Sequence, residues 1–95
     1  MTVTDRISNL LSTAWQFRES EQWEKMLALA AEARSLSEQI GFAAGIPRSL
    51  AVQAFVHYIR SDFRTSLSEC IDALHLGMGD AESECRARSV LALVH

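Results

Sequence analysis

The spacing of apolar residues along the chain predicts five consecutive α-helices. In the first segment Val3, Ile7, Leu11 and Ala14 recur every three or four residues, which places them on one face of a helix. No stretch alternates apolar and polar residues in the way that a half-buried β-strand does. The sequence therefore predicts an all-α fold, with helices over about 3–19, 20–39, 44–60, 61–77 and 80–95.

Residues that favour helix ends support these boundaries. Small polar side chains at a helix N-terminus accept hydrogen bonds from free N–H groups, and glycine suits the left-handed conformation after a helix. Proline is tolerated in the first helical turn. We therefore expect N-caps at Ser20, at Ser61 or Asp62, and at Asp80, a C-terminal glycine at Gly41, and Pro47 in the first turn of its helix.

The chain also contains an internal repeat, which appears in two slightly different alignments. The tryptophan register places Trp23 on Phe63, and the glycine register places Gly41 on Gly79. In the glycine register, residues 51–57 match residues 89–95 at four of seven positions. A recurring pair of helices is typical of a solenoid. We expect one domain over residues 1–95, with repeats at about 3–41 and 42–79 and a half repeat at 80–95, about 2.5 repeats in all.

Three features of the repeat resemble the tetratricopeptide repeat (TPR). Small residues lie late in the first helix (Ala14, Ala54, Ala92) and midway along the second (Ala33, Ala73). A polar residue and an aromatic residue stand at each turn between helices (Gln22-Trp23, Asp62-Phe63). The chain departs from the family where Phe17, His57 and His95 replace the usual tyrosine, and where loops at Gly41 and Gly79 replace the terminal proline.

The glycine loops and the long period are similar to those of TPR variants in bacterial signalling proteins. The resemblance implies antiparallel helix pairs stacked as a short α-solenoid. It also implies a regulatory segment that precedes an output domain such as a diguanylate cyclase. On this interpretation the chain is a fragment of a longer protein.

In such a solenoid the first helix of each repeat lines a concave groove. The equivalent positions here hold Leu11 and Trp15, then Ala51 and Phe55, so a cationic clamp for a carboxylate is missing, and only Arg48 and Arg86 could meet an anion. Trp15, Phe55 and Leu93 share one repeat position, with Tyr58 close by. These residues are either core or an apolar binding groove. The last helix ends on an apolar run that includes Val90, Leu93 and Val94, which we expect to form an interface, either with further chain or with a second copy.

Composition narrows the possible partners. The net charge is −3, from 9 basic and 12 acidic residues without a basic block, which argues against nucleic-acid binding. No apolar run is long enough to predict a membrane span, and no leader sequence is visible, so we expect a cytoplasmic protein. Cys70 and Cys85 lack the spacing of a zinc site. We expect them to be reduced and packed as small apolar residues, and we expect no metal or cofactor.

No catalytic constellation or phosphate-binding loop can be assembled from the sequence, so we expect this segment not to be an enzyme. The leading hypothesis is a protein–protein interaction and regulatory module that forms a homodimer and carries a signal to an attached output domain. The alternative is a receptor or adaptor whose apolar groove binds a peptide or a small molecule.

Overall fold

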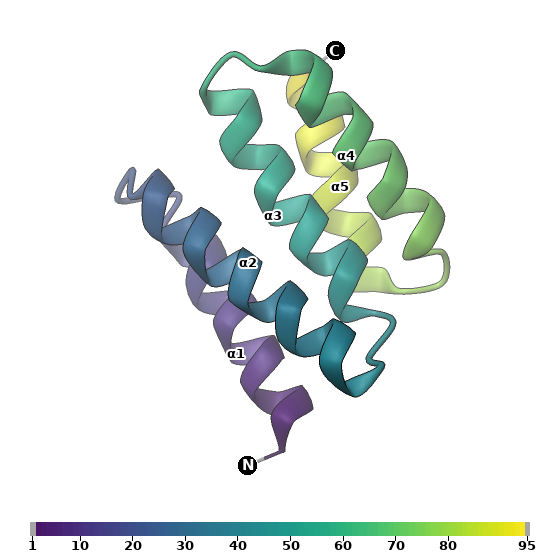
Figure 1. The fold of residues 1–95 in the computed structure, drawn as a ribbon. Coiled ribbons are helices and arrows are strands. Elements are labelled where there is room, and N and C mark those ends of the chain that lie inside the picture. Colours follow the sequence, from purple (N-terminus) through teal and green to yellow (C-terminus); the bar gives the residue numbers. More distant parts are fainter. Residues whose placement is uncertain (1, 95) are drawn as a thin grey trace.

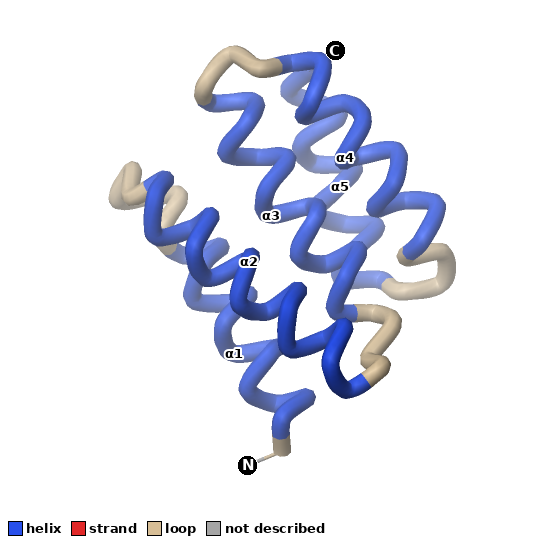
Figure 2. Tube along the Cα trace, viewed as in Figure 1, coloured by secondary structure: helices blue, strands red, loops and turns tan. Residues whose placement is uncertain are grey.

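The structure is a computed structural model that describes residues 2–94, and all the regular structure in this range is α-helical. Consecutive helices run antiparallel, pack against each other and are joined by short loops (Figures 1 and 2). This arrangement confirms the predicted all-α fold class. The helices are α1 (Val3–Gln16), α2 (Trp23–Ile40), α3 (Gly45–Ile59), α4 (Phe63–Leu76) and α5 (Ala81–Val94).

Helix α3 lies at the centre of the molecule and packs against all four other helices (Figure 1). Besides its chain neighbours α2 and α4, it packs against α1 on one side and α5 on the other. Within residues 2–94, the backbones of α1 and α2 do not come close to those of α4 or α5. Because α3 is covered from several directions, its buried residues are spread around its circumference rather than along one stripe.

The core is divided between the two sides of α3. The larger cluster joins α1, α2 and α3 and includes Ile7, Leu11, Met26, Val52 and Val56, all fully buried. Two smaller clusters join α3, α4 and α5, and alanines and Cys70 make up much of them. Four of the small residues predicted at close helix crossings, Ala14, Ala33, Ala54 and Ala73, are fully buried, whereas Ala92 is exposed.

Most helix ends lie within two residues of the prediction, and several expected end residues are confirmed. Gly41 ends α2 with a left-handed φ of 71°, and Pro47 lies in the first turn of α3. The Asp62 carboxylate accepts a hydrogen bond from the Thr65 N–H, and the Asp80 carboxylate accepts one from the Ser83 N–H. These caps could be predicted because each depends on residues close together in the sequence.

The end of α1 and the start of α2 were predicted wrongly. α1 ends at Gln16, since the chain then tightens into i→i−3 hydrogen bonds over residues 18–20. Ser20 does not cap α2, because its hydroxyl donates to the Phe17 carbonyl instead. Glu21 has a left-handed φ of 57°, and α2 begins only after Gln22, whose side chain makes no capping bond.

Two glycines allow close approach between consecutive helices. A Cβ atom on Gly45 would lie 1.9 Å from Ser37 Oγ and 2.7 Å from Ser37 Cβ, across the joint between α2 and α3. A Cβ atom on Gly77 would lie 2.6 Å from Ser83 Cβ, across the joint between α4 and α5. Each joint therefore pairs one serine with one glycine. None of the described helices is long and apolar enough to cross a membrane.

Candidate functional site

The predicted groove residues gather where α1, α3 and α5 meet, around Trp15. The Trp15 and Phe55 rings make an edge-to-face contact, with centroids 5.4 Å apart. Phe55 also contacts Trp23, at 6.0 Å, and Tyr58 packs against Phe63 at 5.7 Å. Trp15, Phe55 and Tyr58 are all partly buried and pack onto the core clusters. Trp15, Phe55 and Trp23 thus form an aromatic cluster at the edge of the core, and Tyr58 packs on the same core beside Phe63.

Other residues predicted to contact a partner, in the groove or at the apolar C-terminal run, are buried or lie elsewhere. Leu11 and Val90 are fully buried inside the domain, so neither can contact a partner, which corrects the prediction for these two residues. They are buried because α2 and α3 cover α1, and because α5 turns Val90 toward Ala54 and Cys70. Leu93 is 51% exposed. The side chain of Val94 lies outside the described residues.

Two arginine side chains flank Trp15. The Arg18 guanidinium lies 4.5 Å from the centre of the ring and donates to the Trp15 carbonyl. The Arg86 guanidinium lies 5.4 Å from the same ring and forms an ion pair with Glu82 at 3.0 Å. Such stacking is a cation–π arrangement. Arg18 was not predicted as part of this site. Its position three residues after Trp15 could have indicated the contact, because residues three apart on a helical turn are neighbours.

Arg86 is the more enclosed of the two arginines. Its pKa is lowered because burial disfavours the charged form, and the positive charges of Arg48 and Arg18 add to this effect. The buried Nη1 atom has no hydrogen-bond partner among the described residues. The guanidinium is therefore held mainly by Trp15 and Glu82.

Arg48 does not face an open anion site. This corrects the expectation that its side chain could meet an anion in the groove. Its guanidinium makes two hydrogen bonds to the Asp80 carboxylate, at 2.9 and 2.7 Å, and an ion pair with Glu82 at 2.8 Å. These contacts lower the pKa of Asp80 well below its usual range, with further hydrogen bonds from Ser83, and raise the pKa of Arg48. Arg48 thus ties the start of α3 to the start of α5.

A second polar contact ties α3 to α4. His57 Nδ1 lies 2.5 Å from a Glu69 carboxylate oxygen, and both side chains are mostly buried. Burial raises the pKa of Glu69, and the neighbouring His57 opposes this shift. His57 therefore packs between α3 and α4 and bonds across their contact.

The two cysteines differ in environment. Cys70 is buried as expected, and burial together with the nearby Glu69 charge raises the pKa of its thiol to about 11. Cys85 is exposed, so its predicted packing as a small apolar residue is wrong. The described residues contain no group of three or more His, Cys, Asp or Glu side chains placed to hold a metal ion.

The outward face of α5, defined here as Cys85, Arg88, Ser89 and Ala92, is exposed along its length. In the glycine register these positions correspond to four residues of α3 that are all buried: Pro47, Leu50, Ala51 and Ala54. Except for Arg88 the face consists of small side chains, and exposed Leu93 lies next to it in the sequence.

Comparison of the chain with protein-family models, with curated proteins and with solved structures found no match.

Proposed function

We propose that this chain is a non-catalytic protein–protein interaction module that pairs with a second copy of itself through the outward face of α5. The observation that carries the proposal is the contrast between α3 and α5. Helix α3 is buried on the side where α5 exposes Cys85, Arg88, Ser89 and Ala92. A packing surface that is filled within the monomer at α3 is thus open at α5.

The two turns within the helix pairs support the proposed TPR-like repeat. Glu21 and Ser61, which are equivalent in the tryptophan register, both have left-handed backbones, with φ of 57° and 63°. The residue after each donates its N–H to a carbonyl five residues back: Gln22 to Phe17 at 3.3 Å, and Asp62 to His57 at 2.9 Å. This hydrogen bond is characteristic of the Schellman motif at a helix C-terminus.

The contacts between the pairs also support a repeat. Gly77 is equivalent to Ser37 in the tryptophan register, and Ser83 is equivalent to Gly45 in the glycine register. The serine–glycine contact at the first joint therefore recurs at the second with the two residue types exchanged. The contacts of α1 with α3, and of α3 with α5, are those of stacked helix pairs.

A second copy is the occupant that the composition of the face favours. Pairing about a two-fold axis requires only that one surface be complementary to itself. Small side chains at Cys85, Ser89 and Ala92 let two helices approach closely, and Glu84 and Arg88 supply both signs of charge at the edge of the contact. The role we propose for this pairing is to bring together output domains attached to the two copies. The TPR resemblance suggests a diguanylate cyclase as one such domain.

The surroundings of Trp15 weigh against the alternative of an apolar ligand groove. Arg18 and Arg86 cover the Trp15 ring, and Leu11 and Val90 are inside the core. A groove at this place would require these side chains to move apart. We therefore assign the interface to α5 rather than to the aromatic cluster.

Sedimentation equilibrium over a wide concentration range tests the proposal. The wild-type chain is expected to form a dimer, and Ala92→Arg is expected to shift it toward monomer, because a long charged side chain would enter the contact. Ala31→Arg is the matched control, since Ala31 is an exposed residue of α2 outside the face. Mild oxidation should link two wild-type chains through Cys85.

The proposal fails if the wild-type chain stays monomeric at the highest concentration reached, or if Ala31→Arg disrupts the dimer as strongly as Ala92→Arg. A monomer whose tryptophan fluorescence responds saturably to an apolar peptide would instead favour the receptor hypothesis. Circular dichroism of each variant establishes that a change in mass is not due to unfolding.

A further inference from the structure

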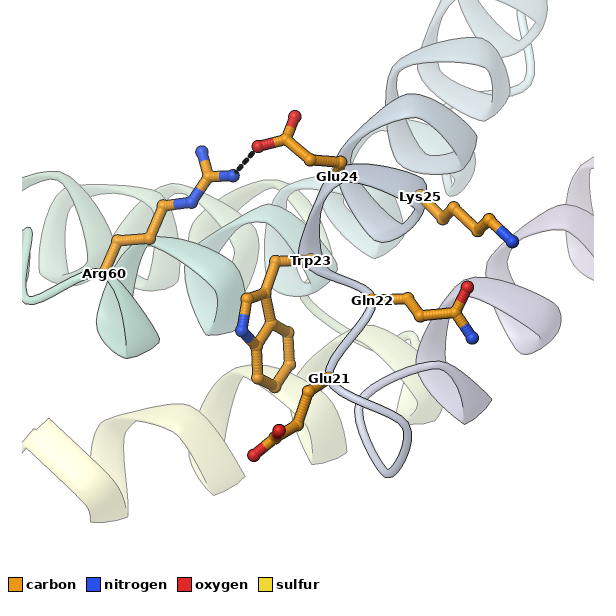
Figure 3. A pocket seen from close by; sticks show the side chains of 6 residues that line it. All are labelled: Glu21, Gln22, Trp23, Glu24, Lys25 and Arg60. Carbon is orange, nitrogen blue, oxygen red and sulfur yellow. Dashed lines mark hydrogen bonds and ion pairs between the residues drawn. The ribbon is translucent and has the colours of Figure 1, made fainter.

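An open pocket of about 310 Å³ lies where the turn between α1 and α2 meets the C-terminal end of α3. It is separate from the face proposed for pairing. Figure 3 shows the Trp23 indole in the middle of the site, with Glu24 and Arg60 on one side and Gln22 and Lys25 directed away from it on the other. The lining consists of Glu21, Gln22, Trp23, Glu24, Lys25 and Arg60.

Trp23 and Trp15 are both partly buried, but Trp23 lines an open pocket whereas two arginines flank the Trp15 ring. Trp23 packs against Phe55, at 6.0 Å, and also lines the open pocket. Trp15 is flanked by Arg18 and Arg86, but within residues 2–94 no lysine or arginine head group lies over the Trp23 ring. Because the face of an indole attracts cations more strongly than other aromatic rings do, Trp23 offers an unused cation–π surface.

Two glutamates are among the residues that line the pocket with Trp23. Glu21 and Glu24 both line the pocket, and Glu24 pairs with Arg60 through a highly exposed contact. The Lys25 ammonium lies 5.5 Å from the Phe17 ring, on the side away from Trp23. The residues that line the pocket thus carry two negative and two positive charges, and one of the positive charges, the Lys25 ammonium, is directed away from the indole.

The second helix pair provides an internal comparison. In the tryptophan register, Glu21 and Glu24 correspond to Ser61 and Arg64, and Trp23 corresponds to Phe63. The backbone of the two turns is alike, with left-handed residues at Glu21 and Ser61. The turn geometry therefore requires neither the acidic residues nor the tryptophan. Of the two turns, only the first combines them.

We propose that this pocket binds an organic cation, a guanidinium or a quaternary ammonium group, against the Trp23 ring and beside the Glu21 and Glu24 carboxylates. Weakly hydrated cations of this kind lose little on leaving water, which suits a wall that is mostly apolar. The cation competes with Arg60 for Glu24. This competition makes a specific prediction, because removal of the Arg60 charge should strengthen binding instead of weakening it.

The test is a titration of the chain with tetramethylammonium and with arginine amide, with sodium chloride at the same ionic strength as the blank. The readout is the indole N–H signal of Trp23 in an NMR spectrum, which Trp15→Phe assigns, since the chain has two tryptophans. A saturable shift of the Trp23 signal is expected with both cations. The Trp15 signal should stay in place, because its ring is already flanked by arginines.

Three variants define the site. Glu24→Gln and Glu21→Gln should each weaken binding about three- to tenfold, and Arg60→Gln should tighten it by a similar factor. Glu38→Gln is the matched control, since it removes the same charge from an exposed residue at the far end of α2 and should leave binding unchanged. All four positions are exposed, so these variants should stay folded.

The proposal is overturned if the Trp23 signal shifts no more with the organic cations than with sodium chloride, or if Arg60→Gln weakens binding. A short arginine-containing peptide that binds much more tightly than arginine amide supports the side chain of a protein partner as the source of the cation. Equal affinities support a free small molecule.

Discussion

The helix pairs α1–α2 and α3–α4 share the backbone of their turns but fill their interiors with different chemistry. Met26 and Ser66 occupy equivalent positions in the tryptophan register, and both are fully buried. Met26 packs in the larger apolar cluster, whereas the Ser66 hydroxyl donates to the Ala54 carbonyl at 2.8 Å. The two pairs thus share the turn geometry and a buried side chain at this position. That side chain is stabilised by apolar contacts in one pair and by a hydrogen bond in the other.

The ties between neighbouring pairs differ in the same way. In the glycine register, Arg48 and Asp80 correspond to Leu10 and Phe42. Leu10 and Phe42 pack against the apolar cluster of α1, α2 and α3, whereas Arg48 and Asp80 join α3 to α5 through an ion pair. The stability contributed by the Arg48–Asp80 ion pair should therefore depend on pH, whereas that contributed by the packing of Leu10 and Phe42 should not.

The largest expected effect comes from the buried position that distinguishes the two pairs. Met26→Ala should lower the free energy of unfolding by about 2–5 kcal/mol, because it leaves a cavity in the larger cluster. Ser66→Ala should lower it by only about 1–2 kcal/mol, because one hydrogen bond is lost and the Ala54 carbonyl loses a partner. Urea unfolding followed by circular dichroism measures both. Equal losses would show that the two interiors are not energetically distinct.

The serine–glycine joints come next. Gly45→Ala should destabilise the chain by about 1–3 kcal/mol through overpacking. Ser37→Gly in the same chain should restore much of this loss, because the two closest contacts of the new Cβ atom are with the Ser37 side chain, and the third, with Phe42 Cδ2, is longer at 3.1 Å. Gly77→Ala should not be rescued by Ser83→Gly, since its Cβ atom would also lie 2.7 Å from the Ala73 carbonyl oxygen.

Thermal unfolding of these single and double variants gives the comparison. The single variants Ser37→Gly and Ser83→Gly are the controls, because they report the loss of helix propensity separately from the steric effect. Rescue at both joints, or at neither, would contradict the geometric difference between them.

The ionic tie between α3 and α5 predicts a pH effect. The pKa of Asp80 is lowered from its ordinary value of 3.8, so the folded state favours the carboxylate more than the unfolded state does. Its contribution to stability is therefore present above pH 3.8 and is lost as the pH falls below this value. Asp80→Asn should be less stable than wild type at neutral pH by about 1–3 kcal/mol.

The difference between wild type and Asp80→Asn should shrink on acidification, which urea unfolding at several pH values measures. Asp72→Asn is a matched control, since Asp72 is exposed on α4. A gap that stays constant down to the lowest pH would show that Asp80 stabilises the fold through packing alone.

The smallest expected effect is an increase in stability at the turns. Ser61 has a left-handed φ of 63°, which is unfavourable for residues with a Cβ atom. Ser61→Gly should therefore raise the free energy of unfolding by about 0.5–1 kcal/mol. Gly41→Ala, at a φ of 71°, should have the opposite effect. A loss of stability in Ser61→Gly would mean that the serine contributes a contact that outweighs its backbone strain.

The helices and most of their ends could be predicted from the sequence. Gly41, Pro47, Asp62 and Asp80 act through the backbone conformation or hydrogen bonds of residues within a few positions, so their effects can be predicted from local chemistry. The prediction was wrong at Ser20, whose hydroxyl donates to the Phe17 carbonyl instead of accepting a hydrogen bond from an N–H group of α2. Local sequence does not discriminate between these two kinds of backbone partner.

Which face of each helix is covered depends on how the helices pack against one another. Leu11 was expected in a groove and Val90 in an apolar terminal interface, but both are buried, because their neighbours in space come from other helices. Arg48 was expected to be open to an anion but meets Asp80, which is far from it in the sequence. The pocket at Trp23 likewise joins the first turn to Arg60. Burial and ion pairing depend on distances between residues far apart in the chain, and helical periodicity carries no information about these distances.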